Sequence, residues 1–237
     1  MNIEVMADDE SAARRAAAII AEEAWASTAA RGKFILAVSG GHTPWVMLRQ
    51  LANERLPWRA IRIVQVDERV APSGHPDRNL THIRESLLDR APLQSEQIHA
   101  MPVESSDLES AAAHYAESLL EIAGAPPVLD LVHLGLGPDG HTASLIPGDP
   151  VLETENQDVA LTGTYQGRRR MTLTYPILNR ARRILWVATG SEKAEMVKRL
   201  LEGDPSIPAG LVSRDHATLV ADSAAAGRRN RGTTARA

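Results

Sequence analysis

The segment that most constrains the fold is a mostly apolar run at residues 128–134 that leads directly into a glycine-rich turn at residues 135–140. The run has the composition of a buried strand, and three glycines then allow the backbone to turn tightly. The turn also brings Asp139 and His141 within two residues of each other. Open α/β sheets place their chemistry at such strand ends, so the segment predicts a sheet of this type with His141 as the candidate catalytic base.

The same turn matches the G-x-G-x-x-G fingerprint of dinucleotide-binding proteins. That motif requires a helix of several turns starting at the third glycine, because the helix N-terminus holds the pyrophosphate. Here Pro147 and Pro150 stop such a helix within about two turns, and Asp139 would direct a negative charge at the phosphates. We therefore expect no nucleotide cofactor.

Composition limits the remaining classes of function. The 26 Lys and Arg residues nearly balance 30 Asp and Glu residues, which gives no electrostatic case for nucleic acid or a membrane as a partner. The chain contains no Cys, so disulfides, thiolate metal sites and a Cys nucleophile are excluded. No His pair has metal-ligand spacing, and no metal or other cofactor is expected. The first ten residues do not resemble a secretion signal and no apolar run is long enough to cross a bilayer, so the expected location is cytoplasmic.

Predicted strands and helices alternate along the chain. We expect strands at 3–6, 34–38, 61–66, 128–134, 159–161, 171–174, 184–189 and 217–221, and the main helices at 8–30, 44–53, 79–89, 107–123 and 191–201. This order favours a doubly wound α/β fold, with a mostly parallel, Rossmann-like sheet flanked by helices. No linker is evident, so residues 1–223 are expected to form a single domain. Residues 224–237 contain no large apolar residue and are expected to be a disordered tail.

The loop after the predicted strand at 34–38 has the composition of a phosphate cradle. It contains Ser39, Gly40, Gly41, His42 and Thr43, and a proline follows at the first position of the next helix. The two glycines let backbone N–H groups face an anion, while the hydroxyl groups add donors. An ordinary turn capped by Thr43 is the alternative, and the loop is not a Walker motif because no Gly-Lys-Ser/Thr follows.

Three further cationic positions follow or begin predicted strands. Asp67, Glu68 and Arg69 end one strand; we expect them to face solvent or a site, because three charges are not expected in the core. Arg69 would hold a phosphate or stabilise an oxyanion, oriented by Asp67 or Glu68, unless the group is merely a surface ion pair. Arg170 lies at the start of another predicted strand. It is either an anion clamp or a solvated residue of an edge strand.

Lys193 lies in the first turn of a predicted helix. Cations are disfavoured at a helix N-terminus, and a bound anion would offset that cost. A solvated lysine is the alternative interpretation.

Together these segments resemble the 6-phosphogluconolactonase family. The resemblance rests on the segments 39–44, 67–69 with the downstream Asn79, 135–148, 170–174 and 190–193, which occur in the family's order. The Asp-Gly-His segment that runs into Ala-Ser-Leu is the specific part. Two departures are Arg78, where the family often has Ser, and Ile146, where it often has Phe.

The resemblance implies hydrolysis of 6-phosphoglucono-δ-lactone in the oxidative pentose phosphate pathway, on a fold shared with glucosamine-6-phosphate deaminase. His141 would take a proton from water, oriented by Asp139 or by the turn backbone. Arg69 would stabilise charge on the carbonyl oxygen. The cradle, Arg170 and Lys193 would hold the 6-phosphate, with Asp67 among the substrate-binding residues. The partner would be this small molecule, bound by a monomer or homodimer.

Two alternatives remain. A deaminase or isomerase of the same fold typically continues Asp-Gly-His-Ile-Ala-Phe-Asn-Glu, whereas this chain has no acid after His141 until Asp149. A non-catalytic sugar-phosphate sensor would keep the cradle but lose the base, and it would carry a DNA-binding segment that we do not find before residue 34.

Overall fold

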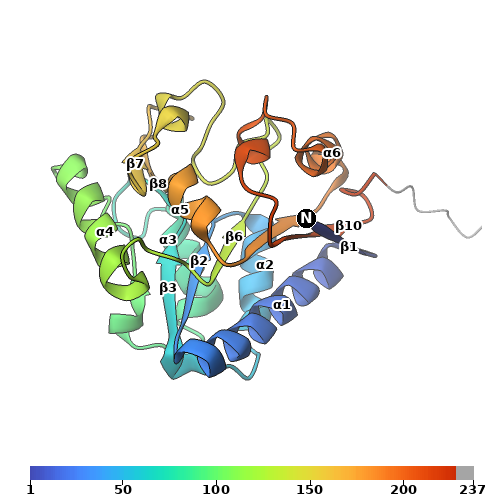
Figure 1. The fold of residues 1–237 in the computed structure, drawn as a ribbon, viewed down its shortest axis with the longest axis horizontal. Helices are drawn as coiled ribbons and strands as arrows, with labels where there is room; N and C mark the ends of the chain where they lie inside the picture. Colours follow the sequence, from blue (N-terminus) through green and yellow to red (C-terminus); the bar gives the residue numbers. More distant parts are fainter. Residues whose placement is uncertain (228–237) are drawn as a thin grey trace, which may run out of the picture.

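The centre of the fold is a seven-stranded parallel sheet, described here for residues 1–227 of a computed structural model. The strand order is β1-β10-β9-β6-β2-β3-β5, so the first and last strands pair at one edge (Figure 1). These strands are β1 (Asn2–Met6), β2 (Phe34–Val38), β3 (Ile61–Gln65), β5 (Ile98–His99), β6 (Leu131–Leu134), β9 (Ile184–Ala188) and β10 (Ala217–Asp222).

Helices cover both faces of this sheet, which confirms the doubly wound α/β expectation. The α-helices are α1 (Asp9–Arg31), α2 (His42–Leu51), α3 (Asn79–Ile83), α4 (Leu108–Ala123), α5 (Tyr175–Arg180) and α6 (Ala194–Glu202). The helix predicted at 79–89 continues past α3 as a π-helical turn at Arg84–Leu88. Shorter 3-10 turns occupy Trp58–Ala60, Ser95–Gln97, Pro150–Glu153, Ser191–Lys193 and Pro208–Leu211.

Residues within one strand alternate between two cores. In β2, Phe34 and Leu36 pack on the side of α1 and α2, whereas Ile35 and Ala37 pack on the side of α4, α5 and α6. Figure 1 shows α1 and α4 on opposite sides of the sheet. A strand buried on both faces is apolar throughout, which explains the continuous apolar run that predicted it.

Local signals set the ends of the elements. Asp8 caps α1 by accepting a hydrogen bond from the Ser11 N–H at 2.7 Å, and Gly32 ends the helix in the left-handed conformation with φ of 73°. A side-chain acceptor satisfies one unpaired N–H at the start of the helix, while glycine takes the left-handed backbone without strain.

A second, antiparallel sheet has the order β4-β8-β7, from β4 (Asp67–Arg69), β8 (Arg170–Leu173) and β7 (Val159–Leu161). β7 and β8 pair antiparallel, with Val159 opposite Leu173. Asp67 and Arg69 face a site, as expected, but Glu68 lies in the core and residues 67–69 do not end the preceding strand. They form a separate strand paired with β8, and Glu68 has no exposed surface.

The strand order reverses between β6 and β2. From β2 the chain continues outward to β3, and from β6 it continues in the other direction to β9. The loops that follow β2 and β6 therefore separate at the carboxyl ends of the two strands and leave a crevice, the usual ligand site of such sheets.

The end of the described chain departs from the expected tail. Residues 224–227 form a turn in which Ala225 is buried and its N–H donates to Asp222 at 2.7 Å. The rest of the expected tail, residues 228–237, lies outside the described residues. Among residues 1–227, no helix is both long and apolar enough to cross a membrane.

Candidate active site

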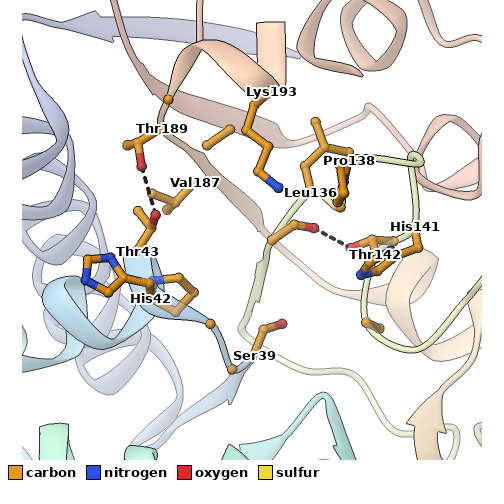
Figure 2. Close-up of a pocket in the computed structure, with 18 of the residues that line it drawn as sticks. Ser39, His42, Thr43, Leu136, Pro138, His141, Thr142, Val187, Thr189 and Lys193 are labelled. Atoms are coloured by element: carbon orange, nitrogen blue, oxygen red, sulfur yellow. Dashed lines mark hydrogen bonds between the residues drawn. The ribbon is translucent and has the colours of Figure 1, made fainter. Parts of the chain in front are cut away.

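A cavity of about 590 Å³ lies at the crevice between β2 and β6. Figure 2 shows the cradle loop on one side of it, His141 on the other, and Lys193 extending into the space between them. The sequence-predicted residues that line it are Ser39, Gly40, Gly41, His42, Thr43, Asp67, Arg69, His141, Arg170 and Lys193. Asp139 is not part of the cavity wall, but it contacts His141. The structure thus brings together residues that are as far apart in the chain as Ser39 and Lys193.

His141 and Asp139 form a hydrogen-bonded pair. The His141 Nδ1 lies 2.5 Å from Asp139 Oδ1, and the His141 backbone N–H donates to the same oxygen at 3.1 Å. Partial burial opposes ionisation of Asp139, but the backbone N–H and the ring of His141 hold its pKa below the usual value. An ionised carboxylate only accepts, so Nδ1 carries the proton and Nε2 is left as the base.

The glycine turn fits closely around this pair. The Gly137 N–H donates to the His141 carbonyl at 2.8 Å, and Gly140 has φ of 83°. A Cβ at Gly137 would lie 2.2 Å from the His141 Nδ1, so only glycine leaves room for the ring. Gly137, one of the three glycines that matched the nucleotide fingerprint, therefore leaves room for the imidazole.

The cradle opens at the N-terminus of α2. Gly41 has φ of 119°, and no side chain caps the helix, so its first N–H groups are available to a ligand. The Thr43 and Thr189 hydroxyl oxygens are 2.8 Å apart, which links the cradle to the loop after β9. Ser39 differs from the expectation of a free donor, because its hydroxyl donates to the His133 carbonyl at 2.9 Å.

Arg170 is a buried cation with few partners. It is 3% exposed, and its guanidinium makes only two long hydrogen bonds, to Ser144 Oγ at 3.5 Å and Gln166 Oε1 at 3.4 Å. Its Nε has no hydrogen-bond partner in the described structure. Burial lowers the pKa of this guanidinium, yet an arginine stays charged. An under-satisfied buried charge beside a cavity suits an anionic ligand.

Arg69 is held by Asn79 rather than by a carboxylate. Its Nη1 donates to Asn79 Oδ1 at 3.1 Å and to the Asp77 carbonyl at 2.9 Å. Asp67 instead accepts from the Ser144 hydroxyl at 2.6 Å, and burial raises the pKa of this carboxyl despite that bond. Within the described residues neither Asp67 nor Glu68 bonds the Arg69 guanidinium, so the expected orientation of Arg69 by one of them is wrong.

Glu68 stabilises the start of α3, the helix that carries Asn79. It accepts from the N–H groups of Asn79 and Leu80 at 2.8 Å each, which caps α3. The Nε of Arg78 lies 3.2 Å from Glu68, and its Nη1 donates to the Ala71 carbonyl at 3.1 Å. Arg78, which stands where the family often has Ser, therefore forms a buried ion pair that anchors the loop preceding α3.

Lys193 contributes the remaining cation. It occupies the N-cap position of α6, but its side chain makes no capping hydrogen bond. Its ammonium makes no ion pair with any residue in 1–227. Across the same residues, no group of three or more His, Asp or Glu side chains gathers in a metal-binding arrangement.

Three side chains of the site were absent from the sequence prediction of functional residues. Asn79 and Ser144 lie inside segments that carried the family resemblance, but their shared partner is Asp67 in β4, which is 12 and 77 positions away from them. Tyr165 gave no local signal at all. Its hydroxyl donates to Asp139 Oδ2 at 3.2 Å, across 26 positions of sequence.

At the crevice where the strand order reverses, the cavity combines an imidazole held by a carboxylate with two cations, Arg170 and Lys193. These features define a protein that acts on a small anionic substrate. The profile of the glucosamine-6-phosphate isomerase/6-phosphogluconolactonase family matches residues 7–221. A 6-phosphogluconolactonase from Synechocystis is 34% identical over 209 residues, covering 86% of this chain and 87% of that protein. The human 6-phosphogluconolactonase is 34% identical over 222 residues, with coverage of 89% and 86%.

Solved structures agree on the fold. The crystal structure of 6-phosphogluconolactonase from Thermotoga maritima superposes with a TM-score of 0.82 at 27% identity, covering 93% of this chain and 98% of that one. A monomeric glucosamine-6-phosphate deaminase superposes with a TM-score of 0.83 at 21% identity, which shows a shared fold. The chain belongs to the glucosamine-6-phosphate isomerase/6-phosphogluconolactonase family, and the family expected from the sequence is confirmed.

Proposed function

We propose that His141 is the general base in the hydrolysis of 6-phospho-D-glucono-1,5-lactone to 6-phosphogluconate. The curated relatives of the chain are named 6-phosphogluconolactonase, and the chain is a carboxylic ester hydrolase of the oxidative pentose phosphate pathway. One observation carries the assignment of the base. The imidazole is fixed by Asp139 at 2.5 Å and remains 22% exposed at the cavity wall, where a water molecule can reach it.

The reaction needs an activated water and stabilisation of the carbonyl oxygen. His141 Nε2 removes a proton from water as its oxygen bonds to C1 of the lactone, and the negative charge of Asp139 stabilises the imidazolium. Arg69 stabilises the oxyanion of the tetrahedral intermediate. The C1–ring oxygen bond then breaks, and the imidazolium returns its proton to the departing ring oxygen.

The phosphate anchor lies away from the bond that breaks. Arg170, Lys193 and the free N–H groups at the start of α2 supply positive potential without competing ion pairs among the described residues. Holding the 6-phosphate there fixes C1 near His141, so that binding energy from a non-reacting group lowers the barrier. We assign Asp67, a cavity-lining acceptor, to the sugar hydroxyl groups.

The position of Asp149 argues against a deaminase. Its carboxylate accepts from the N–H groups of Val151 at 2.9 Å and Gly163 at 2.9 Å, and it does not line the cavity. The first acid after His141 is therefore engaged elsewhere, and ring opening would lack the extra carboxylate that the deaminase motif supplies.

The test is hydrolysis of freshly generated 6-phosphoglucono-δ-lactone against a no-enzyme blank, with glucono-δ-lactone in parallel. We expect strong acceleration for the phosphorylated lactone alone, and a loss of about 10²–10⁴-fold in kcat for His141→Asn with binding of 6-phosphogluconate retained. Near wild-type turnover in His141→Asn would refute the base assignment. Ammonia release from glucosamine 6-phosphate would support the deaminase instead.

We also propose that residues 1–223 act as one domain, as a monomer or homodimer in the cytoplasm. The pairing of β1 with β10 supports the single domain, because the central sheet needs both ends of the chain. The substrate, a phosphorylated sugar of central metabolism, supports the location. Limited proteolysis and sedimentation velocity test the domain and the assembly.

A further inference from the structure

The hairpin between β7 and β8 ends in a tight turn above the catalytic pair. Gln166 has φ of 51° and Gly167 has φ of 77°, and Tyr165 and Arg168 exchange backbone hydrogen bonds of 3.0 and 3.2 Å. Two central residues with positive φ match the twist of a two-residue hairpin. The backbone of Tyr165 is thereby fixed at the last paired position before the turn.

The Tyr165 hydroxyl completes the hydrogen bonding of Asp139. It donates to Oδ2 at 3.2 Å, while Oδ1 accepts from the ring and the backbone of His141. Burial and the charge of Asp139 raise the pKa of Tyr165, so the hydroxyl stays protonated and remains a donor. The carboxylate is held at both oxygens and cannot rotate away from the imidazole.

The Tyr165 ring touches the two other groups that the reaction needs. Its centroid is 6.0 Å from that of the His141 ring, with the planes at 67°, an edge-to-face contact. The Arg170 guanidinium carbon lies 5.0 Å from the same centroid, a cation–π contact. One side chain thus connects the base, its carboxylate and the cation of the phosphate anchor.

The other end of the turn contacts the loop that precedes α3. Arg168 pairs with Asp77 at 3.0 Å, and the Asp77 carbonyl accepts from Arg69 at 2.9 Å. The hairpin tip is therefore held on two sides, by Asp139 and by Asp77. Tyr165 sits in a rigid frame rather than on a free loop.

We propose that Tyr165 is a positioning residue of the lactonase reaction, which fixes the Asp139–His141 pair and sets its separation from Arg170. The proposal rests on the assignment of His141 as the base. Tyr165 acts through these groups, since it does not itself line the cavity.

Tyr165→Phe separates the hydroxyl from the ring. We expect kcat to fall about tenfold with KM within about twofold, because the variant keeps the ring beneath Arg170 but frees one oxygen of Asp139. The acid limb of the kcat/KM profile should move to higher pH, because a carboxylate that no longer shares its charge with a hydroxyl favours the imidazolium more strongly. Tyr165→Leu should add a rise in KM of about fivefold as Arg170 loses its aromatic partner.

The matched control is Tyr175→Phe, which removes a hydroxyl that donates to the Pro208 carbonyl at 3.0 Å and does not line the cavity. This variant should leave kcat and the pH profile unchanged. The other charged or titratable groups that line the same cavity, and whose influence every variant retains, are Asp9, His42, Asp67, Arg69, Arg170, Glu192, Lys193 and Asp222.

His141→Asn is measured alongside the tyrosine variants. An inactive His141→Asn together with a shifted acid limb in Tyr165→Phe supports the proposal. An inactive His141→Asn with a wild-type kcat and pH profile in folded Tyr165→Phe overturns the role of Tyr165 and leaves the proposed function standing. Activity in His141→Asn would overturn both.

Discussion

Gly137→Ala tests whether the glycine turn exists to seat the catalytic ring. A Cβ at this position would lie 2.2 Å from Nδ1 and 2.7 Å from Cγ of His141, whereas ordinary carbon contacts begin at 3.4 Å. The imidazole must therefore withdraw by about 1 Å, which is enough to break its 2.5 Å contact with Asp139.

The backbone itself does not oppose the substitution. Gly137 is not among the glycines with positive φ, so alanine is tolerated by the chain and the clash falls on the ring alone. A displacement of this size costs on the order of 10²-fold in rate when it affects a positioned catalytic group. We expect kcat to fall by about that factor with the melting temperature close to wild type.

Gly135→Ala provides the matched control. It lies two residues earlier in the same turn, also lacks a positive φ, and a Cβ there meets nothing within 4 Å. Its stability should equal or slightly exceed wild type, since alanine reduces the entropy of the unfolded chain, and kcat should be retained. Lactonase rates and thermal melts of both variants are the assay. Equal kcat in the two variants would refute the reasoning that the turn seats the base.

Three further outcomes follow from the charges of the site and its support. Lys193→Met should raise KM for the phosphorylated lactone about 10–100-fold while leaving the slow rate on glucono-δ-lactone unchanged; an unchanged KM would remove this lysine from the anchor. Glu68→Gln should lower the stability by roughly 1–3 kcal/mol, because the buried Arg78 then keeps only its ion pair with the exposed Glu104, and urea unfolding with a loss below about 0.5 kcal/mol would contradict the buried pair. Burial lowers the pKa of His133 to about 3, so the folded ring stays neutral while the unfolded ring, with a pKa of about 6.5, takes up a proton as the pH falls. Stability should therefore drop by roughly 2–3 kcal/mol between pH 6 and pH 4 through this residue, and His133→Gln should lack that part of the drop; parallel pH–stability curves for the two proteins would exclude it.

The elements of the main sheet were predictable because their signals are local. Strands such as Phe34–Val38 are apolar on both faces, and α1 begins and ends at residues whose own side chain or backbone preference marks the boundary. The strand Asp67–Arg69 was not predictable in this way. Its three charged residues favour solvent, and Asp67 and Glu68 are buried only because β8, Asn79 and Arg78 supply partners from elsewhere in the chain.

The sequence by itself determined the doubly wound fold, the family, and the side chains that carry the chemistry, because apolar period, glycine placement and motif order are all readable along the chain. Tertiary structure alone decided how those side chains are used. In the folded chain, Arg69 donates to Asn79 rather than to Asp67, and the Ser39 hydroxyl donates to the His133 carbonyl. Tyr165 contacts both Asp139 and Arg170. These contacts join different segments of the chain, up to 94 positions apart for Ser39 and His133, and their geometry depends on where the sheet order reverses and how the small sheet packs beside it.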